Sequence, residues 1–177
     1  MKKFYSIMLM TTLLFISGNV WAEDVAKIDD KGYATLVDAI KDVNLGNVAS
    51  PATITMVDDC DMASTIAILA GKEITLDLNG KTIKNDASQS LAQLITVNGK
   101  LTIDDNSADK NGVIKNTASG KYVIKTDNAA AVLTLNNGTI ETTTGNSQGA
   151  VYGTKGKFVM TGGKIIAAGT GVTMKNV

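Results

Sequence analysis

The chain of 177 residues contains no histidine and no arginine. Histidine is the commonest general base and metal ligand, and it belongs to most catalytic triads. Arginine is the side chain that holds carboxylates and phosphates through two parallel hydrogen bonds. These absences exclude the catalytic centres that depend on either residue, and they favour a protein that binds over one that catalyses.

Cysteine and proline each occur once, as Cys60 and Pro51. A single cysteine cannot close an internal disulfide. Because no histidine can activate its thiol, we expect Cys60 to be a small buried side chain. Proline interrupts the hydrogen bonds of a central strand, so its absence after residue 51 favours continuous β ladders.

Residues 1–22 have the pattern of a secretory signal peptide. Two lysines precede an apolar stretch from Phe4 to Ile16, and Val20 and Ala22 place small residues at the cleavage-determining positions. This stretch is shorter than the ~20 apolar residues that a membrane anchor needs. We therefore expect a secreted protein, located outside the cell, on its surface or in the periplasm, whose mature chain begins at Glu23 and spans no membrane.

The predicted mature chain has 155 residues with 17 acidic residues and 15 lysines, which gives a formal charge of −2. Its length is sufficient for one domain with its own core. The small charge provides no electrostatic footprint for nucleic acid, so we expect no nucleic-acid partner.

A strand-turn-strand unit occurs four times in the second half of the chain. The apolar residues that open the units are Leu76, Leu101, Leu133 and Phe158, and those that close them are Ile83, Ile114, Ile140 and Ile165. Both series have a period of 25 to 26 residues once a 6-residue polar insertion within residues 104–111 is removed. A further apolar series lies at 94–97, 122–124, 150–152 and 171–174. Repeated columns of this kind predict coils that stack on one another.

This period is too long for one hairpin and too short for a strand-helix-strand crossover. An antiparallel sandwich also has short strands, but it predicts no equivalence between side chains one period apart. A right-handed parallel β-helix does predict it, because each coil stacks on the previous one at about 4.8 Å. We therefore predict an all-β fold, a parallel solenoid of about five coils over residues 51–177.

Residues 23–50 predict a short lead and an N-terminal capping helix within residues 33–45. Apolar residues at helical spacing give this segment one buried face: Leu36, Ala39, Ile40 and Val43. Thr35 and Asp38 have the spacing of a capping box, and residues 44–47 end the helix. A helix laid across the end of a stack covers both its backbone groups and its apolar interior.

The sequence reaches Val177 inside an expected strand, without a closing helix. We therefore expect an uncapped C-terminal coil, which pairs through its edge or continues into further coils. On this interpretation the chain is the N-terminal portion of a longer polypeptide, or the product of a truncated reading frame.

Several runs carry a resemblance to a known group of proteins: Tyr33-Ala34-Thr35-Leu36-Val37-Asp38-Ala39-Ile40, Ile54-Thr55-Met56-Val57-Asp58-Asp59, Gly71 to Ile83, Leu101 to Ser107 and Gly112-Val113-Ile114. These runs resemble the amino-terminal part of bacterial secreted and surface proteins with pectate-lyase-like right-handed β-helices. The resemblance covers about residues 33–165 and implies the same fold. It implies little about activity, because lyases, hydrolases, tailspikes and adhesins share that fold.

Two acidic clusters are candidates for chemistry: Asp58-Asp59 with Asp61, and Asp104-Asp105 with Asp109. In enzymes of the resembled group that cleave uronate polymers, grouped aspartates hold Ca²⁺ or act as acid and base. Consecutive aspartates on a strand point to opposite faces of the sheet. We therefore favour turn and loop roles for both clusters.

The candidate metal ligands are Asp105, Asp109 and Asn111. With Ser107 they have the every-second-residue spacing of a calcium loop, but the sixth position is not glycine and the twelfth is Asn116. We expect no cofactor, with calcium at this turn as the alternative.

The sequence marks no catalytic base among its lysines, of which Lys81, Lys100 and Lys125 are the candidates. Carbohydrate binding usually needs aromatic platforms, and the mature chain offers three tyrosines and Phe158. We predict an exported, non-catalytic, adhesin-like scaffold that presents a rigid face to glycans or proteins at the cell surface. The alternative is a calcium-dependent lyase of uronate polysaccharides, or a fragment of one.

Overall fold

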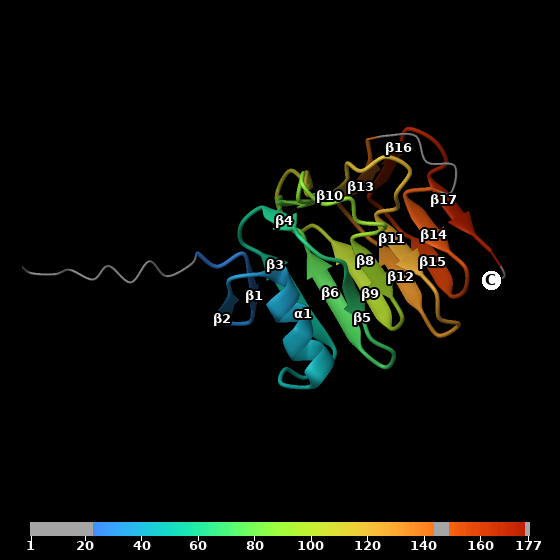
Figure 1. Ribbon diagram of the computed structural model, residues 1–177. Coiled ribbons are helices and arrows are strands. Elements are labelled where there is room, and N and C mark those ends of the chain that lie inside the picture. The colour runs from blue at the N-terminus through green and yellow to red at the C-terminus, as the bar shows by residue number, and fades with distance from the viewer. Residues whose placement is uncertain (1–22, 144–148, 176–177) are drawn as a thin grey trace, which may run out of the picture.

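The computed structural model describes residues 23–143 and 149–175. The predicted signal peptide lies outside the described residues. The described chain is an all-β parallel solenoid of about four turns with a short helix on its N-terminal side (Figure 1). The predicted fold class is confirmed, and two of the three sheets contain five strands each, in agreement with the expected coils.

Three sheets run along the solenoid, and each coil contributes one strand to each sheet. Sheet A contains, in spatial order, β15 (Lys157–Met160), β12 (Val132–Leu135), β9 (Lys100–Asp104), β6 (Glu73–Asp77), β3 (Ala52–Met56), β1 (Ala26–Ile28) and β2 (Lys31–Tyr33). Sheet B contains β16 (Lys164–Ala167), β13 (Thr139–Thr142), β10 (Val113–Asn116), β7 (Thr82–Asn85) and β4 (Cys60–Met62). Sheet C contains β17 (Val172–Met174), β14 (Val151–Gly153), β11 (Ile124–Thr126), β8 (Ile95–Val97) and β5 (Ile66–Ile68). All neighbours pair in parallel except β1, which pairs antiparallel with β2 and β3.

The predicted column of isoleucines in sheet B is confirmed residue by residue. Parallel pairing joins Ile83, Ile114, Ile140 and Ile165 in one register, and Cys60 extends the column by one coil. The series predicted from residues 94–174 is confirmed in sheet C, where the register joins Ile95, Ile124, Val151 and Val172.

The predicted column of sheet A is wrong by two residues at its first member. Leu76 pairs with Ile103, whereas Leu101 pairs with Ile74. The later pairings of Leu101 with Leu133, and of Leu133 with Phe158, are as predicted. A slip of two residues keeps every side chain on its own face of the sheet, so alternation alone does not distinguish the two registers.

The interior is filled by the inward-facing side chains of the three sheets, and most are fully buried. In β6 and the turn after it, Ile74, Leu76 and Leu78 are all 0% exposed, while Thr75 between them lies on the outer face and is only partly covered. The period-2 alternation of the sequence therefore separates a dry core from an outer surface of threonine and lysine.

Helix α1 (Leu36–Leu45) lies across the N-terminal end of the stack, as predicted, and it contacts β1, β2, β3 and β5 (Figure 1). The Thr35 hydroxyl accepts the Asp38 N–H at 3.0 Å, and Gly46 adopts the left-handed conformation that ends many helices. Among the described residues, no helix has the length and apolar character needed to cross a membrane.

Candidate functional site

The polar insertion between β9 and β10 is built around the carboxylate of Asp105, which is 0% exposed. Its Oδ1 accepts the Gly80 N–H at 2.9 Å and both the hydroxyl and the N–H of Ser107, at 2.7 and 3.1 Å. Its Oδ2 accepts the Gly112 N–H at 2.6 Å. The side chain therefore joins both ends of the insertion to the turn of the preceding coil.

Burial by itself would raise the pKa of Asp105, but the hydrogen bonds from Ser107, Gly112 and Gly80 outweigh it and hold the pKa below its usual value. Gly112 is needed for this approach, because a Cβ built at that position would lie 2.8 Å from Asp105 Oδ2 and 2.5 Å from the Leu78 Cβ. The insertion is thus organised as a loop around one ionised carboxylate.

The predicted calcium ligands occupy different environments. Asp105 is buried and directs both oxygens at N–H and O–H donors, whereas Asp109 and Asn111 are exposed. In the part of the chain that the structure describes, no three histidine, cysteine, aspartate or glutamate side chains are grouped so that they could hold a metal ion. Calcium at this turn stays a prediction, and the contacts of Asp105 do not favour it.

The other acidic cluster belongs to the first coil, where Asp59 accepts the Thr82 N–H at 2.8 Å and Asp58 accepts the Asp59 N–H at 2.8 Å. Asp61 forms an exposed ion pair with Lys84 at 3.5 Å. These contacts agree with the turn and loop roles expected from the sequence.

Asp77 and Asp104 are neighbours in the register of sheet A. A lyase centre would need carboxylates from adjacent coils such as these on one face, beside a lysine. Both accept hydrogen bonds from the corner of the solenoid: Asp77 from the backbone and side-chain amides of Asn106, each at 3.0 Å, and Asp104 from Asn137 at 2.7 Å. These carboxylates stabilise the turn between sheets A and B.

The candidate lysines lie apart. Lys100 pairs with Glu73 at 3.1 Å on sheet A, and Lys125 pairs with Asp127 at 2.9 Å beside sheet C. The thiol of Cys60 is buried, and burial raises its pKa, so the expected packing role of this residue agrees with the structure.

A buried polar column, which was not predicted from the sequence, lies at the corner between sheets B and C. Asn85, Asn116 and Thr142 occupy one inward position on successive coils and are 3% exposed or less. The Asn85 amide donates to the carbonyls of Asp86 and Gln89, and the Asn116 amide donates to those of Leu91 and Tyr122. The repeated Ile-Lys-Asn at 83–85 and 114–116 was the available signal.

The outer face of sheet C carries a surface that contains aromatic and basic groups together. The register aligns Thr96, Lys125 and Tyr152 on this face. The rings of Tyr122 and Tyr152 stack with centroids 4.7 Å apart and planes 13° apart, and Lys175 Nζ lies 5.6 Å from the Tyr152 centroid. We call Tyr122, Lys125, Tyr152 and Lys175 the tyrosine surface.

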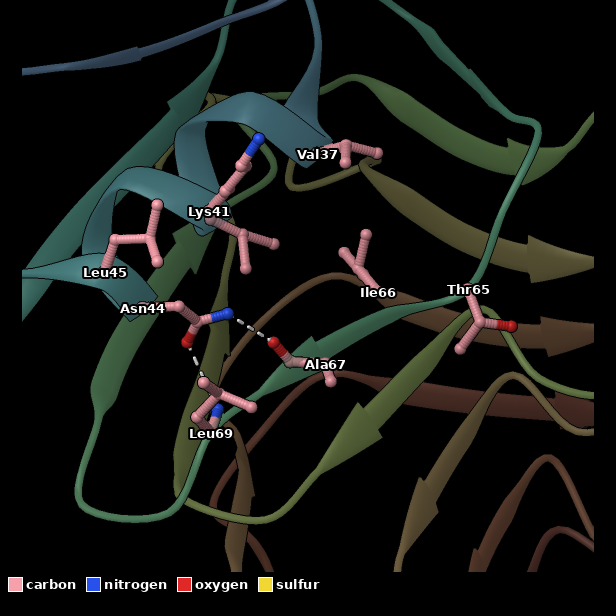
Figure 2. Close-up of a pocket in the computed structure, with 9 residues that line it drawn as sticks. Val37, Lys41, Asn44, Leu45, Thr65, Ile66, Ala67 and Leu69 are labelled. Carbon is pink, nitrogen blue, oxygen red and sulfur yellow. Dashed lines mark hydrogen bonds between the residues drawn. The ribbon is translucent and has the colours of Figure 1, made fainter.

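A second surface feature is an apolar groove of about 320 Å³ between α1 and β5 (Figure 2). Its rim exposes Val37, Leu45 and Leu69, which are 37%, 65% and 45% exposed. Asn44 closes one side, because its amide donates to the Ala67 carbonyl at 2.7 Å and its oxygen accepts the Leu69 N–H at 3.2 Å. This side chain takes the place of a neighbouring strand along the free edge of β5.

Comparison with known proteins assigns no family to this fold. No family model matches the chain, and neither the curated proteins nor the solved structures contain a significant match to it.

Proposed function

We propose that this chain is an exported, non-catalytic, adhesin-like β-helix of the pectate-lyase-like kind, whose tyrosine surface binds acidic glycans outside the cell. The observation that carries the proposal is the stacked pair Tyr122 and Tyr152 with Lys125 and Lys175 beside it, on a sheet in which β11 and β14 each pair on both sides.

The chemistry of this surface suits an acidic sugar. A tyrosine offers a large, rigid, amphipathic contact area at a low entropic cost, because its side chain has few rotatable bonds. The ammonium group of Lys175, which is exposed, offers charge to a carboxylate, whereas that of Lys125 is paired with Asp127. The parallel ladder holds these groups before a ligand arrives, which reduces the ordering cost of binding.

Binding of the chain from Glu23 onward to immobilised polygalacturonate and alginate, with dextran as an uncharged comparison, tests the proposal. We expect Lys175→Ala to weaken binding to the acidic polymers, and Tyr152→Thr to weaken it further, on the order of tenfold, which corresponds to about 1.4 kcal/mol. Lys115→Ala, which removes a lysine from the outer face of sheet B, is the matched control and should bind as the unmodified chain does.

Thermal unfolding of each variant checks that a loss of binding is not a loss of fold. Equal affinity of all four proteins, or the same affinity for dextran, would contradict the proposed surface. A calcium-dependent rise in the absorbance of unsaturated uronate products would replace this proposal by the lyase alternative.

A further inference from the structure

Exposed apolar side chains gather at the groove between α1 and β5. Five large apolar side chains are exposed in the described parts of the chain, and three of them surround this groove: Val37, Leu45 and Leu69. The other two, Met160 and Ile166, lie in β15 and β16. A single exposed apolar side chain is ordinary, but a group of them beside a hollow marks a contact site.

The groove has the form that a second helix needs. Val37, Lys41 and Leu45 are spaced by four residues, so they make one ridge along the outer side of α1 (Figure 2). The hollow of about 320 Å³ lies beside this ridge, and β5 with Leu69 forms its other wall. Asn44 uses both ends of its amide in hydrogen bonds to the β5 segment, so it leaves the groove to apolar contacts.

The charges beside the ridge are complementary to those of a second copy that runs in the opposite direction. Lys41, at the middle of the ridge, is exposed and takes part in none of the salt bridges found among the described residues. Asp38 is exposed one turn earlier, and the hydroxyl that donates to it, from Thr35, leaves its negative charge in place. Asp42 is already paired with Lys31 and is not needed.

We propose that two copies of the chain associate through this ridge and groove, with their α1 helices antiparallel about a twofold axis at Lys41. Ridges of residues four apart pack into one another in the commonest class of helix contact, at a crossing angle of about 50°. In this arrangement Leu45 of each copy meets Val37 of the other, and each Lys41 lies within one turn of the Asp38 of the other copy. The apolar contacts stabilise the pair, and the charges fix its orientation.

An interface of this kind uses the same surface on both copies, so the assembly closes at two. Four of the ten residues of α1 are buried against its own coil, which leaves a small surface for the contact. Interfaces below about 1,200 Å² belong to weak, transient complexes. We therefore expect a dimer that exchanges with the monomer and depends on concentration.

Sedimentation velocity of the chain from Glu23 onward, over a range of concentrations, tests the proposal. We expect a monomer–dimer equilibrium that stops at two copies. Leu45→Asp, which places a charge in the contact, should weaken the dimer by about tenfold or more. Ile166→Asp makes the same kind of change at an exposed apolar residue of β16 and should leave the dimer unchanged.

Thermal unfolding of both aspartate variants checks that each is folded. A chain that stays monomeric at every concentration would overturn the proposal, as would species that grow beyond two copies. Loss of the dimer in Ile166→Asp but not in Leu45→Asp would overturn it as well, because the contact would then lie elsewhere.

Disulfide trapping determines how the two helices lie. A residue on a twofold axis meets its own copy, so Lys41→Cys protein should form a linked dimer on oxidation. Leu45→Cys protein should link to Val37→Cys protein in a mixture and little to itself. The unmodified chain, which keeps the buried Cys60, measures the background. Self-linking of Leu45→Cys that exceeds that of Lys41→Cys would overturn the antiparallel arrangement, and linking of none of these proteins above background would overturn the interface.

Discussion

The two ends of the solenoid close its core in different ways. At the N-terminal end, α1 places Leu36, Ala39, Ile40 and Val43 against the first coil, and all four are 2% exposed or less. At the opposite end, Phe158, Ile165 and Val172 hold the equivalent inward positions but are only partly buried. The repeating coil builds the interior of the stack, whereas an end is sealed only by an element that does not repeat.

The sharpest test of this difference is the same truncation at each end. We expect Ile40→Ala, which leaves a cavity under α1, to lower the free energy of unfolding by about 3 kcal/mol, and Ile165→Ala to lower it by about 1 kcal/mol, because solvent already reaches that side chain. Urea unfolding at high salt and low protein concentration measures both. Equal losses would indicate that the open end is covered in solution.

The next largest expected effect is the loss of stability when Asn44 no longer forms hydrogen bonds to the free edge of β5. Asn44→Ala removes two hydrogen bonds to the free edge of β5, and we expect a loss of about 2 kcal/mol and faster hydrogen exchange at the Leu69 amide. Asn47→Ala is the control, because Asn47 is exposed and bonds only to the Asp42 side chain among the described residues. An unchanged Leu69 amide would show that the helix backbone alone protects the edge.

Two buried threonines, Thr126 in β11 and Thr142 in β13 of the next coil, provide a smaller comparison. The Thr126 hydroxyl donates to the Lys155 carbonyl at 2.8 Å, whereas the Thr142 hydroxyl has no partner among the described residues. Thr126→Val should cost about 1 kcal/mol, and Thr142→Val should be neutral or stabilising, since it removes an unpaired buried hydroxyl. Thermal unfolding of both variants measures these changes in stability. A larger loss of stability for Thr142→Val than for Thr126→Val would contradict the interpretation that the Thr142 hydroxyl is the unpaired one.

The smallest expected effect is on the pH dependence of stability, through Asp42 of α1 at the covered end. Hydrogen bonds from Lys31 at 2.6 Å and from Asn47 at 3.1 Å lower the pKa of Asp42 from 3.8 to about 2. Because the pKa is lower in the folded state, Asp42 contributes stability above about pH 4 and loses it as the pH falls toward about 2. Unfolding midpoints between these values should fall less steeply for Asp42→Asn than for the unmodified chain. An equal fall of the unfolding midpoint with pH in the two proteins would exclude a contribution of Asp42 to the pH dependence of stability.

The sequence was sufficient to predict the solenoid, the helix at its N-terminal end and the isoleucine column, because each rests on a strong periodic signal. Register in sheet A was not fully predictable. Ile74 and Leu76 both face inward, so either could align with Leu101, and the choice depends on turns whose lengths vary from coil to coil.

The candidate sites were harder to predict, since side-chain contacts between coils have no simple sequence spacing. Asp105 was a candidate ligand because of the every-second-residue spacing at 105–111, but it is buried and accepts hydrogen bonds from the backbone of residues 80 and 112 in two different turns. Tyr122 and Tyr152 belong to neighbouring members of the series predicted at 122–124 and 150–152, but the sequence did not indicate that their rings would stack beside Lys125 and Lys175. The buried Asn85 and Asn116 had a visible repeat, Ile-Lys-Asn, from which no prediction was drawn.

The position of α1 has a consequence for the order in which the chain folds. Translation delivers the N-terminal part of a protein first. Helix α1 and the first coil lie at 36–68, so the sealed end is complete before the later coils emerge, and each new coil meets a finished edge on which to pair. A solenoid sealed at the opposite end would have to wait for its last residues. The covered end therefore serves as the template from which the rest of the stack grows.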